Sequence, residues 1–472
     1  MKFDNSYARL PERFFARVRP ESVPNPRLLA WNTGLADELG LNGMASSEAR
    51  LAELFGGNEI PAGAEPIALA YAGHQFGHFV PQLGDGRAVL LGEIVSPHDG
   101  RRYDLQLKGS GQTPFSRRGD GKASLGPVIR EYILSEALHH LGVPTTRSLA
   151  AVQTGEPVYR ETEMPGGVLT RVAASHLRIG TFEYFAACRD LEALQRLADF
   201  AIERHYPEVM DTPYPVAAFF GKVVEAQAAL IAHWMDIGFI HGVMNTDNTS
   251  ISGETIDYGP CAFLDEFHFH KVFSSIDRDG RYAYGRQASI AHWNLARLGE
   301  CLLPLVDDPQ LLEAELDRFQ GCFEQHYLAR MRRKLGLTTE EPADRDLVTT
   351  WLQHLQDHAL DYTLSFRRLG ARTDAEGPNE FGEFETRWRQ RIARQAESPA
   401  GIRQRMEAVN PLFIPRNHQV ERAIQEAING DLSAFDELNR VLQRPFSEQS
   451  EFSHYAEPPQ PSERVVRTFC GT

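Results

Sequence analysis

Short apolar runs between residues 87 and 172 are separated by turn-forming Gly, Pro and Asp residues. Runs of this length, bounded in this way, predict strands. The predicted strands cover residues 87–94, 102–108, 146–154, 157–161 and 167–172. One segment of this region, 127–141, instead carries apolar residues at helical spacing and begins with a Pro that suits the first helical turn. The pattern therefore predicts a β-rich region with one helix inside it.

Helical periodicity dominates the chain after residue 180. The predicted helices cover residues 181–204, 216–237 and most of 287–441, with a small β-rich patch at 240–284. The first 75 residues are expected to be irregular apart from a helical stretch at 32–55. The last segment is polar and rich in Pro, which predicts a mobile tail.

A strand-rich region with one central helix, joined to a helical region, is typical of protein kinases. We therefore expect an α+β protein with the bilobal protein-kinase-like fold, a β-rich N-lobe and a large helical C-lobe. The expected parts are an extension packing on the lobes (1–75), the N-lobe (76–178), the C-lobe (179–444) and the tail (445–472). The active site is expected in the cleft between the lobes.

The composition is that of an ordinary globular protein, and 472 residues are enough for two or three domains or lobes. The net charge of -15 opposes binding to nucleic acid, so ATP would need local cations and a metal. We see no signal-peptide pattern in the first 20 residues and no apolar run as long as a membrane span. Five scattered Cys without metal-binding spacing indicate a reducing compartment. We expect a cytoplasmic protein without nucleic-acid or membrane partners.

The most informative motif runs from His241 to Asn248 and is followed by Asp257-Tyr258-Gly259. It is similar to the catalytic loop and metal-binding tripeptide of protein kinases, H-R-D-x-x-x-x-N and D-F-G. Val243 stands where a kinase has the Asp that takes the substrate's hydroxyl proton, and Val cannot accept a proton. The metal-binding positions are retained, and the usual base is absent.

Asn248 and Asp257 supply oxygen ligands of the kind that Mg²⁺ prefers. Their spacing predicts a tight hairpin with its turn at Ser252-Gly253. Asp247 is the carboxylate that could replace the missing base if it points toward the substrate hydroxyl. The alternative is a loop Asp that caps a turn.

Lys108 ends a predicted strand, and Glu131 lies on the predicted helix that follows. These are the places where a kinase holds its phosphate-contacting Lys and the partner Glu. Because a buried Lys loses its charge unless it is paired, an ion pair between them has a physical reason. The alternative is two unrelated surface charges.

Three further features could contact phosphate. Leu83-Gly84-Asp85-Gly86-Arg87 precedes a strand, and its glycines let the backbone approach a phosphate, although a simple hairpin turn explains them as well. The Gly-rich basic segment 109–122 is not a Walker A loop, because Ala123 follows where Ser or Thr is required. We expect it to be a flexible cationic flap, with a disordered surface loop as the alternative. Arg171 and Arg178 could clamp phosphates near the lobe junction, or form ordinary solvent salt bridges.

With these motifs in place, the chain resembles the selenoprotein O family of kinase-like proteins over most of its length. The residues that carry the resemblance are 71–77, 81–87, 107–111, 241–248 and 257–260. The first of these segments contains His74, and His78 follows it directly; we expect both histidines to pack or form hydrogen bonds rather than to bind zinc.

The resemblance implies a protein adenylyltransferase, which transfers AMP from ATP to Ser, Thr or Tyr hydroxyls of proteins and releases pyrophosphate. ATP is reversed in the site relative to kinases. The implied metal ligands (for Mg²⁺ or Mn²⁺) are Asn248 and Asp257, and Asp247 is the implied proton acceptor. Self-modification is plausible. The implied nucleotide-binding residues are Gly84, Gly86, Arg87, Lys108, Asp120, Gly121, Arg171, Arg178 and Asp257.

The selenium-containing members of this family carry selenocysteine near the C-terminus, where this chain has Cys470. We hypothesise a redox-dependent disulfide between Cys470 and Cys261, which lies four residues after Asp257; two unpaired thiols are the alternative. Two other functions stay open. One is a kinase-type phosphotransferase, which Val243 disfavours. The other is an inactive nucleotide-binding scaffold, which is disfavoured by the retained Lys108, Glu131, Asn248 and Asp257.

Overall fold

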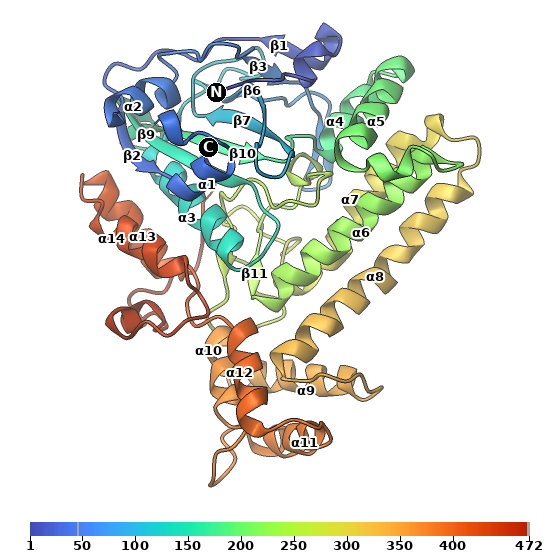
Figure 1. Cartoon of the computed structure of the whole chain (residues 1–472), viewed down its shortest axis with the longest axis vertical. Helices are drawn as coiled ribbons and strands as arrows, with labels where there is room; N and C mark the ends of the chain where they lie inside the picture. Colours follow the sequence, from blue (N-terminus) through green and yellow to red (C-terminus); the bar gives the residue numbers. More distant parts are fainter. Residues whose placement is uncertain (45–46, 470–472) are drawn as a thin grey trace.

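A computed structural model describes residues 1–44 and 47–469. The fold is mixed α/β, with one eight-stranded sheet whose neighbouring strands are antiparallel, and many helices (Figure 1). The strand order is β1-β3-β6-β7-β10-β9-β2, and β8 pairs with β10. The strands are β1 (Phe15–Arg17), β2 (Arg27–Trp31), β3 (Ile67–Leu69), β6 (Ala88–Val95), β7 (Arg102–Lys108), β8 (Ala123–Ser124), β9 (Arg147–Tyr159) and β10 (Glu163–Ala173).

Two small ladders lie outside this sheet. They are β4 (Gly73–Gln75) with β5 (His78–Val80), and β11 (Phe239–Ile240) with β12 (Ala262–Phe263). The helices of the sheet region and of the segment after it are α1 (Thr33–Glu38), α2 (Glu48–Gly56), α3 (Leu125–His140), α4 (Ile179–Ala187), α5 (Leu191–His205), α6 (Pro215–Asp236) and α7 (Gln287–Leu302). The later helices are α8 (Gln310–Lys334), α9 (Asp344–Asp357), α10 (Tyr362–Gly370), α11 (Gly382–Ile392), α12 (Pro399–Val409), α13 (Asn417–Ile428) and α14 (Ser433–Leu442).

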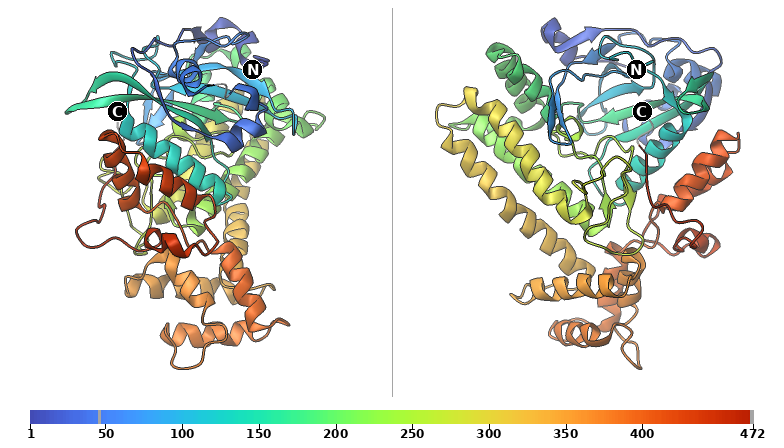
Figure 2. Two further views of the ribbon diagram at one scale, coloured as in Figure 1. Left: turned by 60° about the vertical axis from the view of Figure 1, so that its left-hand side comes forward. Right: turned by 180° about the vertical axis from the view of Figure 1, so that it is seen from behind.

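Helix α3 is the central helix that the sequence predicted, and it is buried on both sides. One side contacts β9 and β10, and the other contacts α13 and α14 (Figure 2). Apolar residues around the whole circumference, including Val128, Ile133 and Leu138, explain this position. Two helices from the end of the chain thus clamp α3 against the sheet, and α3 in turn holds Glu131 in place.

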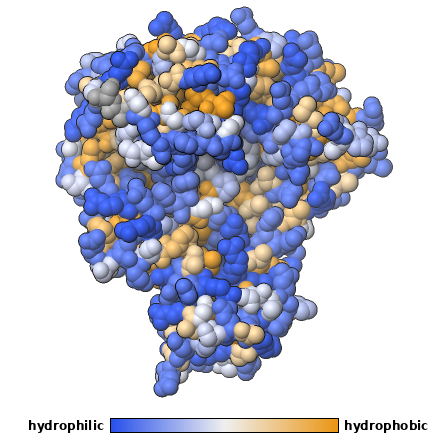
Figure 3. Space-filling view, viewed as in Figure 1, coloured by the Kyte–Doolittle hydropathy of each residue, from blue (hydrophilic) through white to orange (hydrophobic). Residues whose placement is uncertain are grey.

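The helices α6, α7 and α8 run side by side below the sheet, and α9 to α12 form the lower end of the molecule (Figure 1). By length and composition, α6 is apolar enough to cross a membrane, so the expectation that no run approaches a membrane span was wrong. Within its most apolar window, 67% of the helix is buried, and it packs on α7 and α8. Its apolar character is that of a core helix. The face shown in Figure 3 is mostly hydrophilic, with apolar residues scattered between the polar ones.

The predicted strands at 87–94 and 102–108 are confirmed as β6 and β7. The predictions for 146–154 and 157–161 were wrong in one respect, because a single strand, β9, covers both. The segment 181–204 is two helices, which separate where Arg189 adopts a positive φ of 55°. The segment 32–55 likewise forms α1 and α2 rather than one helix.

Two larger expectations were wrong. The first 75 residues are not irregular, because β1, β2 and β3 join the main sheet at both of its sides. The only strands of the patch at 240–284 are the short β11 and β12, and apart from short helical turns the rest is irregular. Outside the ladder of β11 and β12, its segments pair with distant ones: Ser250 with Arg178, and Thr255 with Thr145. The predicted hairpin between Asn248 and Asp257 is therefore a turn without a ladder of its own.

The C-terminal segment is tied to the rest of the chain up to residue 469. Phe452 and Tyr455 are buried, and the backbone of Thr468 donates to Phe273 and accepts from Ser275. The hydroxyl of Thr468 also donates to the carbonyl of Pro260, at 2.5 Å. Cys470 lies outside the described residues.

Candidate active site

A cavity of about 400 Å³ lies between the sheet, α3 and the loop that follows β11; we call it the central cavity. The side chains that line it come from chain segments far apart in the sequence. Its walls include most of the predicted site residues: Gly86, Arg87, Lys108, Glu131, Arg171, Arg178, Asp247, Asn248 and Asp257. Gly84, Asp120 and Gly121 do not line it. The cavity is large enough for part of a nucleotide to enter.

The predicted ion pair between Lys108 and Glu131 is present. Lys108 Nζ lies 2.7 Å from Glu131 Oε2 and 2.6 Å from Asp257 Oδ1. Strand β7 ends at Lys108, so the ammonium group lies near the end of this strand. Glu131, its partner, is carried by α3. Only 15% of the Lys108 side chain and 7% of the Glu131 side chain are exposed. The surface-charge alternative for these two residues is therefore wrong.

Arg171 and Arg178 complete this network, and they are almost fully buried. Arg171 Nη2 lies 2.5 Å from Glu131 Oε1 and 2.7 Å from Asp257 Oδ1. Arg178 lies 3.4 Å from Asp257 Oδ2 and 3.6 Å from Asp85 Oδ1. They are not solvent salt bridges, and the network matches three cations with three carboxylates.

Charge interactions decide the ionisation of the two central carboxylates. Burial raises the pKa of Glu131, but the charges of Arg171 and Lys108 outweigh burial and lower it overall. For Asp257, burial again raises the pKa, and Arg171, Lys108 and Arg178 together hold it well below its usual value. Both groups are therefore anionic over the physiological range.

The loop from His241 to Asn248 is fixed by hydrogen bonds at both ends. The buried His241 ring stacks on Trp234, and its Nε2 lies 2.9 Å from the carbonyl of Ile256, next to Asp257. The Asn248 amide nitrogen donates to the carbonyl of Val243 at 3.0 Å.

Asp247 lines the central cavity together with Val243 and is the middle residue of the short helical turn Thr246–Asn248. Only 8% of it is exposed, and its Oδ1 atom has no hydrogen-bond partner among the described residues. Gln75 Nε2 donates to its Oδ2 atom at 3.3 Å. Burial raises the pKa of Asp247 to about 7. A carboxylate with this pKa, facing a cavity, is suited to accept a proton near neutral pH.

The hairpin β4–β5 covers this loop and was not predicted. The backbone of His74 donates to Thr246 Oγ1 at 2.7 Å, and the backbone of Phe76 donates to Asn245 Oδ1 at 3.0 Å. The His74 ring bonds Glu183 Oε1 at 2.5 Å, so it forms a hydrogen bond as we expected. Gly73 has no side chain because Asp247 Oδ1 would lie 2.4 Å from an added Cβ.

The glycines at 84 and 86 have a packing role. A Cβ at Gly84, where φ is +70°, would lie 2.3 Å from the Phe115 ring, and a Cβ at Gly86 would lie 2.9 Å from the Phe115 carbonyl oxygen. The hydroxyl of Ser116 donates to the Gly86 carbonyl at 2.5 Å. The Gly-rich segments before β6 and after β7 are therefore bound tightly to each other.

Asp120 and Gly121 belong to the segment that we expected to form a flap, and Gly121 is buried. Arg160 pairs with Asp120 at 2.7 Å, and the Asp120 side chain is 43% exposed. The hydrogen bond from Arg160 lowers the pKa of Asp120. Gly121 packs on Gly111, whose backbone oxygen would lie 2.0 Å from an added Cβ. In this structure both residues shape the segment.

Three residues in or beside the ionic network were missed by the sequence reasoning. Asp85 is buried, accepts from the backbone of Leu69 and from Gln106 at 3.1 Å, and faces Arg178. The Tyr71 ring lies 4.6 Å below the Arg178 guanidinium group. Asp85 lies between two glycines, and that pattern indicates a backbone role rather than a side-chain role. Tyr71 and Gln75 lie in a motif without an evident chemical role.

Cys261 is fully buried, and its thiol donates to the carbonyl of Tyr258 at 3.2 Å. Burial raises the pKa of this thiol to about 12. A thiol in this state reacts slowly unless the site opens. The disulfide with Cys470 stays a hypothesis because Cys470 lies outside the described residues.

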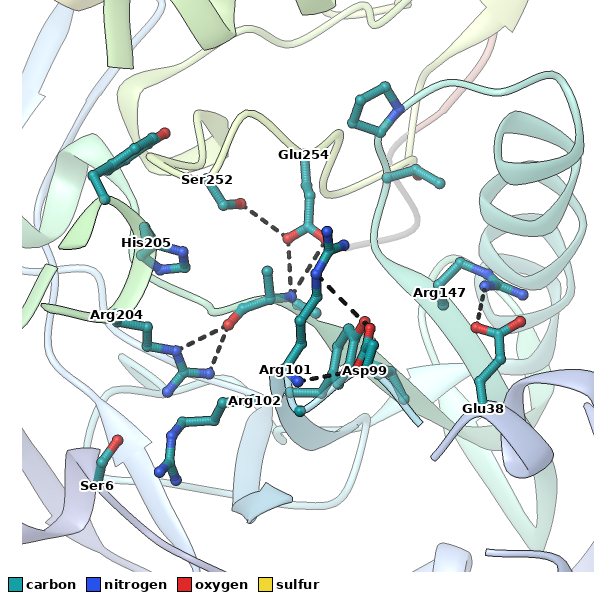
Figure 4. A pocket seen from close by; sticks show the side chains of 18 of the residues that line it. Ser6, Glu38, Asp99, Arg101, Arg102, Arg147, Arg204, His205, Ser252 and Glu254 are labelled. Atoms are coloured by element: carbon teal, nitrogen blue, oxygen red, sulfur yellow. Dashed lines mark hydrogen bonds and ion pairs between the residues drawn. The ribbon is translucent and has the colours of Figure 1, made fainter. Parts of the chain in front are cut away.

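A larger cavity, of about 1160 Å³, lies on the other side of the connection between β10 and α4 (Figure 4). None of the predicted site residues lines it. Two of the arginines that line it are paired with carboxylates: Arg204 with Glu93 and Asp104 at 2.7 and 2.6 Å, and Arg147 with Glu136 at 2.8 Å. The chemistry of the predicted site is therefore in the smaller, central cavity.

A divalent metal fits the donor set of the central cavity. Asn248 and Asp257 line this cavity and carry an amide oxygen and a carboxylate, which are ligands for Mg²⁺ or Mn²⁺. Residues 1–44 and 47–469 contain no cluster of three or more His, Cys, Asp or Glu side chains that could hold a metal ion.

Comparison with known proteins agrees with this site. Residues 1–443 match the family described as "Protein adenylyltransferase SelO". The "Protein nucleotidyltransferase YdiU" of Bradyrhizobium sp. (strain ORS 278) is 56% identical over 486 residues, which cover 100% of this chain and 99% of the relative. The protein of the same name from Agrobacterium fabrum (strain C58 / ATCC 33970) is 54% identical over 487 residues, covering 100% of both chains.

These similarities show that the chain is an enzyme of the nucleotidyltransferase class. It belongs to the SelO family of protein adenylyltransferases. The family resemblance inferred from the sequence motifs is thereby confirmed.

Proposed function

We propose that this chain transfers AMP from ATP to Ser, Thr or Tyr hydroxyls of proteins, and that its own hydroxyls are among the acceptors. The observation that carries the proposal is the position of Asp247. It lies in the same cavity as the cations Lys108, Arg171 and Arg178, beside the Val243 that replaces a kinase base. A proton acceptor and a network of buried cations are thus brought together in one cavity.

The reaction needs one proton acceptor and charge stabilisation. Asp247 takes the proton of the acceptor hydroxyl as its oxygen attacks the α-phosphorus of ATP. A P–O bond forms to the acceptor, the bond between the α-phosphorus and the bridging oxygen breaks, and pyrophosphate leaves with that electron pair. The cations of the cavity offset the charge of the phosphates, which is the main contribution of a protein to phosphoryl-type transfer.

Asn248 and Asp257 would hold Mg²⁺ or Mn²⁺, and such a metal would supply positive charge to the phosphate oxygens. Asp257 is already oriented by three cations, and its backbone has a positive φ of 65°. A residue other than Gly that is held at positive φ is strained, and backbone strain of this kind is found most often at functional sites. These ion pairs, rather than a helix or strand, hold the carboxylate of Asp257 in place. They support its assignment as a metal ligand.

The kinase-like organisation is part of this proposal. The sheet region and α3 would form the N-lobe (76–178), the helices from α4 onward the C-lobe (179–444), and residues 1–75 and 445–472 an extension and a tail. The nucleotide would contact Gly84, Asp120 and Gly121 in addition to the lining residues. We also propose a cytoplasmic location and the redox pair Cys261–Cys470.

The deciding experiment uses ATP labelled separately at the α- and γ-positions, with Mg²⁺ or Mn²⁺ and a mixture of proteins as acceptors. Protein labelling from the α-position alone, absent in the Asp247→Asn variant, is the expected result. Labelling from the γ-position alone would show a phosphotransferase. No labelling from either position, with retained ATP binding, would show a nucleotide-binding scaffold.

A further inference from the structure

The innermost cations of the central cavity are committed to carboxylates. Lys108 and Arg171 each contact both Glu131 and Asp257, and Arg178 contacts Asp257 and Asp85. These three cations and three carboxylates cancel in net charge. A triphosphate that enters the cavity therefore needs positive charge from outside this network.

Arg117 lines the same cavity and is exposed. Within the described part of the chain, no carboxylate lies at ion-pair distance from it, in contrast to Lys108, Arg171 and Arg178. Arg87 also lines the cavity, but it has interactions of its own. Arg117 is thus a cation that a ligand can bind without first displacing a protein carboxylate.

The backbone at Arg117 is strained. The amide of Gly119 donates to the carbonyl of Ser116 at 2.7 Å, which closes a tight turn with Arg117 and Arg118 in the centre. Their φ angles are 46° and 80°. A turn with two positive φ angles strongly favours Asn and Gly at these places, and Arg fits it poorly.

The strain at Arg117 belongs to a pattern. Six residues other than Gly have positive φ in the described chain, and three of them line the central cavity: Phe76, Arg117 and Asp257. A local sequence rule that is broken without an evident gain in packing indicates a functional site. The exposed side chain of Arg117 gains no packing that would offset the strain.

We propose that Arg117 binds the β- and γ-phosphates of ATP, and that its strained turn exists to hold this guanidinium group over the cavity. The role is a binding role and rests on the proposed use of ATP by this site. Tight hydrogen bonds of the neighbouring Ser116 to Gly86 and to the backbone of Thr113, at 2.5 and 2.8 Å, keep the turn in place. Arg117 therefore meets the phosphates without a large rearrangement of the segment.

Arg118 offers a matched control, because it has the same kind of strain and the same charge but does not line the cavity. We compare Arg117→Gly and Arg118→Gly in the full chain. Calorimetric titration gives the Kd for ATP and for AMP with Mg²⁺, and thermal unfolding gives Tm. Each substitution removes one strained residue, so both variants are expected to have a higher Tm than the wild type.

Of these two variants, only Arg117→Gly is expected to lose ATP affinity. The expected loss is about 10- to 100-fold, which is the effect of losing a charge-assisted hydrogen bond. Its affinity for AMP is expected to stay within about twofold, because AMP lacks the β- and γ-phosphates. Arg117→Lys should retain part of the ATP affinity. Arg117→Gln, which keeps the strain and removes the charge, should lose as much ATP affinity as Arg117→Gly.

Unchanged ATP affinity in Arg117→Gly and Arg117→Gln would overturn the proposal, as would an equal loss for ATP and AMP. If Arg118→Gly lost as much ATP affinity as Arg117→Gly, the effect would be one of general surface charge, and the proposal would be overturned as well. Wild-type protein that binds ATP but does not transfer its α-phosphate would instead refute the proposed function, which keeps the two failures distinguishable.

Discussion

Replacing Glu131 by Gln tests whether the ionic network is a structural necessity of the site. The Glu131 carboxylate accepts from Lys108 Nζ at 2.7 Å and from Arg171 Nε and Nη2 at 2.8 and 2.5 Å. Gln keeps the shape but removes the charge, and its amide NH₂ group must face one of these donors. Three cations are then balanced by two carboxylates in a buried place.

Breaking a buried pair by removing one partner costs about 3–5 kcal/mol of stability, because a charge is left uncompensated. The Arg171 side chain is 2% exposed and takes the full effect, whereas Lys108 at 15% keeps some contact with water. We therefore expect Glu131→Gln to lower the free energy of unfolding by about 3 kcal/mol. Urea denaturation of the two proteins at pH 7, analysed with a common m value, measures this difference.

The same reasoning predicts that an anionic ligand restores stability. ATP with Mg²⁺ should stabilise Glu131→Gln more than it stabilises the wild type, because phosphate replaces the missing negative charge. As a control, Glu192→Gln removes an exposed carboxylate that lies 3.3 Å from Arg13, and it should change stability by less than about 0.5 kcal/mol. A loss below about 1 kcal/mol in Glu131→Gln, with no extra stabilisation by ATP, would refute the reasoning.

The remaining predictions concern the proton acceptor, the metal, pH and redox state. Asp247→Asn should lower AMP transfer by about 10²- to 10⁴-fold while ATP binding persists, and a rate within about twofold of wild type would remove Asp247 from the mechanism. Asp257→Ala should abolish the dependence of transfer on added Mg²⁺ or Mn²⁺ together with the activity; full metal-dependent activity would refute the metal assignment. Burial raises the pKa of Glu254 to about 7, so the folded state binds its proton more tightly than the unfolded state, and stability falls as pH rises from about 4.5 to 7. Glu254→Gln should therefore gain about 1–2 kcal/mol relative to wild type between pH 5 and pH 8, measured by denaturation, and an equal pH dependence in both proteins would contradict this. Peptide mapping under oxidant without reductant should recover a Cys261–Cys470 peptide that Cys470→Ser lacks; consistent absence of this peptide would end the disulfide hypothesis.

The ion pair of Lys108 and Glu131 shows why part of the site was predictable. Both residues lie at definite places in regular elements, one at the end of a strand and one on a helix, so local periodicity located them. The strand β7 and most of α3 were found with nearly correct bounds for the same reason. Asp247 was identified because the base expected in its loop was missing.

The predictions failed where a segment is held by distant partners. In the region 240–284, Thr255 pairs with Thr145 and Ser250 with Arg178, so no local alternation of apolar residues marks its conformation. The strands β1, β2 and β3 were missed because they are short and gain their stability from the neighbouring strands of the sheet.

The sequence by itself determined the family, the class of reaction and the residue types of the site, because motifs of this kind keep their chemistry in a fixed local order. Only the tertiary structure decided which of these residues face the cavity. It placed Gly84 and Gly121 in packing contacts, buried Asp85 beside Arg178, and set Gln75 on Asp247 across 172 positions of sequence. The physical reason is that the charge and hydrogen bonding of a buried group depend on neighbours that the fold brings together, and those neighbours lie far away along the chain.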